Sequence, residues 1–313
     1  MRLFVGLTDY DWFRYHAARE NVEEINFWRP SSEAGFKALL PGELFLFKLH
    51  APRNFIAGGG FFVRFLQTPV SLAWRAFGTA NGADSLQALR ERISRYRHKP
   101  ISLREDPAIG CIILGEPFFL LQEQWIPAPT DFSSNIVQGK GYDVEGGTGR
   151  LLWQEVRERL EAQAAQTAAP GPATGAVIQG PRFASPVTVL PRYGQGAFRL
   201  LVTEAYNRRC AMTRERTLPV LDAAHIHPYS LGGPHLPANG ILLRSDLHRL
   251  FDLGYLTVDP DKRVVLVSRR LKEDFENGRD YYALQGKGIL LPTDPQNLPS
   301  RENLVYHAER VYR

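Results

Sequence analysis

The chain has 313 residues, of which 44% are hydrophobic and 23% charged, and its formal net charge is +5. This composition excludes a disordered protein and leaves room for about two folded domains. The sequence shows no apolar run of membrane length and no signal peptide, so we expect a cytoplasmic protein without a membrane partner. Cys111 and Cys210 have no paired spacing and predict neither a disulfide framework nor a structural zinc site.

The first half of the chain predicts a small α+β domain. Its apolar patterns predict, in chain order, a strand over 2–7, a helix over 8–19, and strands over 43–50 and 54–67. They further predict two helical pieces over 71–97 with Asn81 and Gly82 between them, strands over 109–114 and 117–121, and a helix over 151–165. Gly58, Gly59 and Gly60 interrupt the strand over 54–67 and indicate a bulge or a close backbone approach. We expect these strands to form a mostly antiparallel, barrel-like sheet.

Three motifs follow one another in this half: NFWRP, PGELFLFKLH and FIAGGGFFV. Their order resembles the PUA superfamily, and within it the EVE-type readers of modified bases. The resemblance covers about residues 2–150 and implies an aromatic pocket that takes a flipped base. The candidate pocket residues are Asn26, Phe27 and Trp28, with Trp12, Tyr10 and His50 behind them. Alternatively, these aromatic side chains only fill the core, as aromatic residues in strands usually do.

The composition changes between residues 161 and 186. This stretch is rich in Ala, Pro and Gly and almost uncharged after Glu161, which is typical of a tether. We therefore expect a recognition domain over 1–160, a linker over 161–186 and a second domain over 187–313.

The second domain concentrates reactive side chains between Val220 and Gly254. Histidines, an asparagine and aspartates occur together there: Asp222, His225, His227, His235, Asn239, Asp246, His248 and Asp252. The pattern predicts a strand over 220–227, a loop over 229–239, a short strand over 240–243, and a helix capped by Ser245 and closed by Gly254.

Within this stretch, AHIHP, PANGILL and DLHRLFDLG occur in that order. The series resembles the HNH (ββα-metal) nuclease family, from about Pro191 to the end of the chain. The resemblance implies that His225 is the general base and that His248 is a metal ligand on the helix. It also implies that Asn239 hydrogen-bonds backbone and holds the base strand in place. We expect a C-terminal ββα-metal HNH domain.

The chemistry agrees with these residue types, with one departure at Ala224. A neutral imidazole can take a proton from water, and a divalent ion can neutralise a phosphodiester. Many family members carry Asp or His immediately before the base, whereas Ala224 cannot coordinate a metal. Asp222, on the same strand face, is the substitute ligand that we expect beside His248. The donors suit Mg²⁺, Mn²⁺ or Ni²⁺, and Zn²⁺ would also fit.

Basic side chains around the motif are candidates for phosphate contacts, although each could equally be a solvated surface residue. The candidates are His227, Arg199, Arg208, Arg209, Arg244 and Arg249. We expect His235 to face solvent, and Asp252 to make hydrogen bonds at the helix end rather than to bind metal. Beyond the motif, the pattern predicts a hairpin across residues 259–262 and a helix at the end of the chain.

Together these features predict a two-domain, metal-dependent DNA endonuclease. The architecture resembles modification-dependent, type IV-like restriction endonucleases, which implies double-stranded DNA with modified cytosine as the partner. Because each HNH domain cuts one strand, a homodimer would be needed for double-strand cleavage. The alternatives are a non-cleaving module that binds modified DNA or RNA through a weakened metal site, and a first half that serves only for dimerisation or structure.

Overall fold

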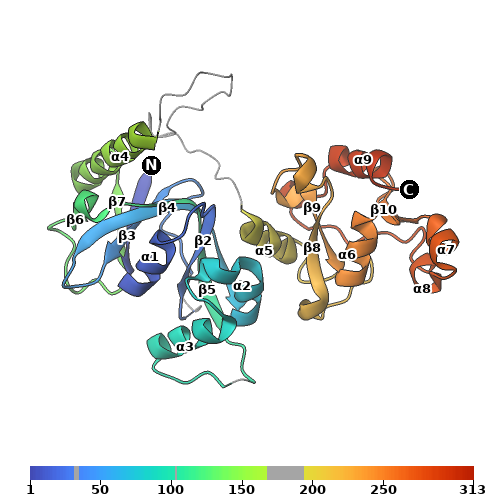
Figure 1. The fold of residues 1–313 in the computed structure, drawn as a ribbon, viewed down its shortest axis with the longest axis horizontal. Coiled ribbons are helices and arrows are strands. Elements are labelled where there is room, and N and C mark those ends of the chain that lie inside the picture. Colours follow the sequence, from blue (N-terminus) through green and yellow to red (C-terminus); the bar gives the residue numbers. More distant parts are fainter. Residues whose placement is uncertain (32–34, 103, 168–193) are drawn as a thin grey trace. The chain divides into compact units, whose positions relative to one another are not determined.

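The computed structural model describes residues 1–31, 35–102, 104–167 and 194–313. The chain divides into two compact units, Met1–Arg192 and Tyr193–Arg313 (Figure 1). Of the expected linker, residues 168–186 lie outside the described residues, and the residues before them belong to a helix that reaches Thr167. In the described parts of the chain, no helix is long and apolar enough to cross a membrane.

The N-terminal unit combines one large sheet with four α-helices in its described residues. Its elements are β1 (Arg2–Thr8), α1 (Tyr10–Ala17), β2 (Glu24–Arg29), β3 (Leu44–Leu49), β4 (Phe55–Pro69), α2 (Val70–Phe77), α3 (Leu86–Arg97), β5 (Ala108–Phe119), β6 (Ile126–Pro127), β7 (Gly139–Asp143) and α4 (Gly147–Thr167). The two helical pieces predicted over 71–97 are confirmed as α2 and α3, whereas the two strands predicted over 109–121 are the single strand β5.

The sheet of this unit is open. Its strand order is β2-β5-β4-β3-β1-β7, with β6 paired to β4. Only β1 and β3 run parallel, and the other pairs in this sheet are antiparallel. Among the described residues β2 and β7 do not pair, so the expected barrel-like closure is wrong, and a PUA-like barrel is not confirmed.

Helices cover both faces of the sheet, which explains why every residue of β3 is buried. Leu44 and Leu46 pack in the cluster that contains the side chains of α4. Phe45 and Phe47 point the other way and pack with the aromatic residues of α1. The alternation of leucine and phenylalanine along β3 therefore serves two separate cores.

The glycines of β4 lie where the backbones approach closely. A Cβ atom on Gly58 would lie 2.3 Å from the backbone oxygen of Phe118, and one on Gly59 would lie 2.6 Å from that of Phe45. The register against β5 shifts between Gly59 and Phe61. The expected bulge and close approach are both confirmed.

The C-terminal unit contains two short hairpins surrounded by helices. Its elements are α5 (Gln195–Ala205), β8 (Leu221–His225), β9 (Gly240–Arg244), α6 (Ser245–Asp252), β10 (Leu256–Val258), β11 (Val265–Val267), α7 (Arg270–Phe275), α8 (Arg279–Tyr282) and α9 (Arg301–Arg310). The hairpin predicted across residues 259–262 is confirmed as β10 and β11.

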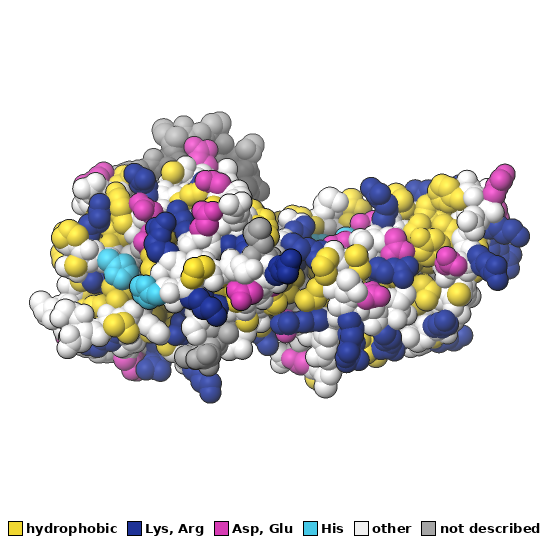
Figure 2. Space-filling view, turned by 90° about the horizontal axis from the view of Figure 1, so that it is seen from below, with side chains coloured by type: hydrophobic (Ala, Val, Ile, Leu, Met, Phe, Trp, Pro, Cys, Tyr) yellow, Lys and Arg dark blue, Asp and Glu magenta, His cyan; other side chains and the backbone are white. Residues whose placement is uncertain are grey.

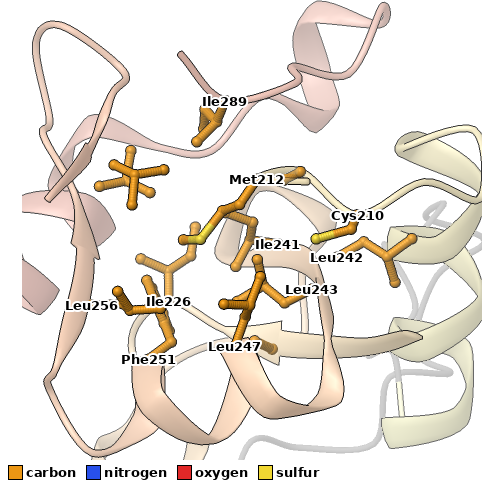
Figure 3. Packing of buried hydrophobic residues seen from close by; sticks show 14 of the residues in the cluster. Cys210, Met212, Ile226, Ile241, Leu242, Leu243, Leu247, Phe251, Leu256 and Ile289 are labelled. Carbon is orange, nitrogen blue, oxygen red and sulfur yellow. The ribbon is translucent and has the colours of Figure 1, made fainter. Parts of the chain in front are cut away.

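One hydrophobic core fixes the first hairpin of this unit to its helix. Ile241 and Leu243 of β9 are fully buried, as are Leu247 and Phe251 of α6 (Figure 3). Met212 and Ile289 from other segments close the same cluster. The polar residues on β8 and α6 are thereby held on a rigid support.

Candidate active site

The site is built on β8, β9 and α6, in the order strand, loop, strand, helix that the sequence predicts. β8 and β9 pair antiparallel, and His225 lies opposite Gly240 at the end of the hairpin where the connecting loop begins. α6 begins immediately after β9, and His248 lies in its first turn. Ser245 is the first residue of α6 rather than its cap; the N-cap is Arg244, and no side chain caps the helix.

Asn239 ties together the two arms of the loop between β8 and β9. Its Oδ1 accepts a hydrogen bond from the backbone N–H of His227 at 2.8 Å. Its Nδ2 donates to the backbone oxygens of His227 at 2.9 Å and Pro234 at 3.0 Å. The side chain is fully buried, so these bonds satisfy polar groups that water cannot reach. This geometry is the one that the sequence predicts for Asn239.

His225 lies at the end of β8 in a partly buried aromatic environment. Its ring stacks on Phe198 of α5, with centroids 3.8 Å apart and an interplanar angle of 9°. Its Nε2 lies 2.9 Å from Nδ1 of His235, and its own Nδ1 makes no hydrogen bond to the described residues. Burial, and then the charge of a protonated His235, lower the pKa of His225 to about 4. The imidazole is therefore neutral near pH 7, as a general base requires.

His248 lies between two carboxylates. Its Nε2 is 3.2 Å from Oδ2 of Asp252, and its Nδ1 is 3.9 Å from Oδ2 of Asp222. Burial opposes the charged form, but the hydrogen bond and charge of Asp252, together with Asp222, outweigh it and raise the pKa of His248. The charges of His248 and Asp252 also act on the pKa of His225. The groups therefore belong to one electrostatic site.

This donor set has the composition of a divalent-ion site. One imidazole and two carboxylates suit Mg²⁺, Mn²⁺, Ni²⁺ or Zn²⁺, and the raised pKa of His248 shows that the local field favours positive charge. In the described parts of the chain, no three His, Cys, Asp or Glu side chains already have the spacing of a metal centre. Binding would therefore require His248, Asp252 and Asp222 to adjust. Ala224 is fully buried in the hydrophobic core and contributes packing instead.

Two of the predicted phosphate contacts are engaged in local ion pairs. Arg244 binds both oxygens of Asp246, each at 2.7 Å, and Arg208 binds Glu204 at 2.8 Å. The hydrogen bond from Arg244 is the main reason why the pKa of Asp246 lies below its usual value. Arg244 and Asp246 thus stabilise the entry of α6.

The other candidates lie in different surroundings. His227 stacks on Tyr306 and its Nε2 lies 3.1 Å from the backbone oxygen of Leu231. Arg209 has a buried Nε without a partner among the described residues. Arg199 contributes to the field at His225. Arg249 lines a shallow depression together with His248 and is the candidate placed beside the site.

The structure brings two further residues to the site. His235, expected to face solvent, is partly buried, bonds His225, and stacks on Tyr229 with centroids 3.9 Å apart. No motif signals this role, because it depends on how the loop folds. Asp252, expected to make hydrogen bonds at the helix end, contacts Nε2 of His248 at 3.2 Å, one turn away along α6.

The N-terminal unit contains a pocket of about 570 Å³. Four of the six residues predicted for base recognition line it: Trp12, Phe27, Trp28 and His50. Arg92 and Arg95 of α3 also lie in its wall.

The other two predicted pocket residues lie elsewhere. Asn26 is fully buried, and its Nδ2 donates to Asn81 at 2.9 Å. Tyr10 lies beneath the guanidinium group of Arg53. The aromatic residues of this unit therefore divide between the pocket wall and the core.

Comparisons with known proteins support the C-terminal site. The family model described as HNH endonuclease matches residues 210–259, the stretch that carries β8, β9 and α6. No curated protein matches the chain. Two mutant forms of ZmASCH from Zymomonas mobilis are each 10% identical; they cover 51% of this chain and 96% and 95% of their own, with TM-scores of 0.29 and 0.30. The ββα geometry and the family match together indicate a nuclease, a hydrolase that acts on nucleic acid.

Proposed function

We propose that the chain is a metal-dependent HNH endonuclease that hydrolyses phosphodiester bonds in double-stranded DNA. This proposal rests on two neighbouring imidazoles whose pKa values are shifted in opposite directions. His225 is kept neutral at the end of β8, and His248 is held between carboxylates on α6. Environments that push two titratable groups apart are typical of acid–base sites. The family match over residues 210–259 supports the same assignment.

In the proposed reaction, Nδ1 of His225 accepts a proton from the attacking water. Asn239 keeps the strand end and loop in place, so that the ring does not move during the transfer. A divalent ion held by His248, Asp252 and Asp222 would neutralise the phosphate and the leaving oxygen. Arg249, on the same helix, would bind an adjacent phosphate.

We further propose that the N-terminal pocket selects DNA with modified cytosine. Its volume of about 570 Å³ and its aromatic wall of Trp12, Phe27 and Trp28 suit a flipped base. Arg92 and Arg95 would hold the phosphates of the same strand. We propose that the protein acts on this modified DNA in the cytoplasm.

Double-strand cleavage would require two copies of the ββα site, one for each strand. We therefore propose that the chain acts as a homodimer on DNA. Sedimentation with and without a duplex tests this directly: a complex with two chains is expected, and a complex with one chain would refute it.

Cleavage of matched DNAs tests the function as a whole. Unmodified, methylated, hydroxymethylated and glucosylated duplexes are each incubated with Mg²⁺, Mn²⁺, Ni²⁺ or Zn²⁺. We expect cleavage that requires metal, stops with chelator and prefers a modified duplex. Equal cleavage of all duplexes would refute the role of the pocket.

If the chain binds DNA but cleaves none of these duplexes, it is a binding module with a weakened metal site. Ala224, which cannot coordinate a metal, would favour that outcome. Competition by structured RNA would then decide between DNA and RNA as its ligand.

A further inference from the structure

His235 and His225 form a pair of imidazoles in contact, and the proposed reaction gives His235 no role. Nε2 of His225 lies 2.9 Å from Nδ1 of His235, a hydrogen-bonding distance. Phe198 stacks on the first ring at 3.8 Å, and Tyr229 stacks on the second at 3.9 Å. The two imidazoles are therefore fixed by an aromatic ring on each, and their mutual orientation is not left to solvent.

The proton between the rings decides what His225 can do. Two neutral imidazoles at this distance share one proton, because two lone pairs would repel each other. If Nδ1 of His235 carried this proton, neutral His225 would carry its own proton on Nδ1. That nitrogen could then not accept a proton from water. If Nε2 of His225 carries it, Nδ1 has a free lone pair, and this nitrogen makes no hydrogen bond to the described residues.

We propose that His235 is a positioning residue of the nuclease site, whose Nδ1 accepts the Nε2–H of His225 and so leaves Nδ1 of His225 as the basic nitrogen. This inference rests on the proposed function of His225. When the attacking water is deprotonated, its proton goes to Nδ1 of His225, and Nε2–H stays bonded to His235. The bond then becomes charge-assisted and stronger, which stabilises the imidazolium as it forms.

A neutral partner has an advantage over a carboxylate here. A carboxylate would raise the proton affinity of the resting base and keep it partly protonated, whereas His235 orients the ring without adding negative charge. The other charged groups that act on His225 are Arg199 and His248, which disfavour its protonation, and Asp252, which favours it. His235 therefore orients the base while leaving it available near neutral pH.

The loop holds His235 rigidly enough for this role. The backbone oxygen of Pro234, the preceding residue, accepts from Asn239 at 3.0 Å. Gly233 packs so closely that a Cβ atom there would lie 1.9 Å from the backbone oxygen of His227. The imidazole therefore extends from an anchored segment.

The test compares His235→Ala with His235→Asn, whose Oδ1 can accept a hydrogen bond near the original Nδ1 position. Leu231→Ala, on the same loop with an exposed side chain, is the control. Plasmid cleavage is measured at saturating metal. We expect His235→Ala to lower kcat by about 10- to 100-fold and to leave KM for DNA unchanged, while His235→Asn regains most of kcat.

A spectroscopic readout separates positioning from mere structure. Nitrogen NMR of the ring should show the Nε2–H tautomer of His225 in the wild type and in His235→Asn, and a mixture in His235→Ala.

Wild-type kcat and an unchanged tautomer in His235→Ala would overturn the proposal, as would a change in KM alone, which would mark a DNA contact instead. If the wild type cleaves no DNA, the nuclease assignment fails separately, and the tautomer of His225 still decides whether His235 positions the ring.

Discussion

His225 and His248 are the same residue type with opposite proton affinities, and this difference defines the site. Burial and His235 depress the pKa of His225 to about 4, whereas Asp252 and Asp222 overcome burial to raise that of His248. Near pH 7, His225 can therefore accept a proton. In the proposed reaction, a proton at His248 would compete with a metal ion for the same ring.

This competition predicts how activity depends on pH. As pH falls, His248 protonates first because its pKa is raised, and metal is released while His225 is still neutral. The acid limb of kcat/KM should therefore move to lower pH when the metal concentration is increased. The measurement is a pH–rate profile at two Mg²⁺ concentrations. An acid limb that does not respond to metal would contradict this assignment of His248.

Asn239 should matter for stability as well as for activity. Asn239→Ala removes three hydrogen bonds to backbone groups of His227 and Pro234 and leaves buried polar atoms unsatisfied. We expect a loss of about 2–4 kcal/mol in the free energy of unfolding, measured with denaturant. Asn239→Asp keeps the acceptor but loses both donated bonds, so it should be nearly as destabilising. An aspartate variant as stable as the wild type would refute the donor role.

The sequence could place His225 on a strand, Asn239 at a loop end and His248 on a helix, because these positions follow from local order along the chain. His235 could not be predicted in this way, since its contact with His225 depends on the path of the loop around Gly233 and on Tyr229. Contacts between side chains that no regular element relates to one another are not encoded in spacing.

Among the helices, α5 packs against His225, the proposed base, through the ring of Phe198. A Cβ atom on Gly240 would lie 2.3 Å from Cγ2 of Val202 and 3.0 Å from the ring of Phe198, which stacks on His225. Gly240→Ala should therefore push α5 away from β9, cost about 1–3 kcal/mol of stability and lower kcat. Gly288→Ala is the control, because nothing lies within 4 Å of the added atom.

Thermal unfolding and nicking assays of the two glycine variants provide the measurement. If both variants have the stability and kcat of the wild type, the support that α5 gives to the base is not needed.

Helix α3 offers a second test. Arg92 and Arg95 line the N-terminal pocket, whereas the guanidinium group of Arg90 on the same helix donates to the backbone oxygen of Ser102 at 2.6 Å. Arg92→Ala and Arg95→Ala should each reduce the salt dependence of binding to modified DNA by about one phosphate contact.

Fluorescence anisotropy with a labelled modified duplex at several salt concentrations measures this effect. Arg90→Ala is the matched control and should lower stability without changing the salt slope. Equal slopes for all the proteins would show that α3 does not contact the phosphates.

The sequence predicted most of the elements of the N-terminal unit but not how its sheet is assembled. Local alternation marks strands such as β3, yet it does not tell which strands pair. The parallel pairing of β1 with β3 and the placement of β2 beside β5 arise from contacts far apart along the chain. Helices on both faces leave the sheet open, and short apolar runs alone could not distinguish this from a barrel.

At the scale of the whole molecule, the two units divide the proposed work between them. The aromatic pocket lies in one, and the paired imidazoles lie in the other. Figure 2 shows Lys and Arg side chains spread over the visible surface of each unit, with Asp and Glu among them. A net charge of +5 distributed in this way favours contact with a polyanion only weakly. Specificity for a particular DNA must therefore come from the two sites.

In the proposed function, the ββα unit hydrolyses phosphodiester bonds through His225. The most direct measurement is the rate at which supercoiled plasmid is nicked by the wild type and by His225→Ala, in the same buffer with Mg²⁺ or Mn²⁺. We expect nicking by the wild type that chelator abolishes, and a rate at least about 100-fold lower for His225→Ala. Equal rates for the two proteins, or no nicking by the wild type with any metal, would contradict it.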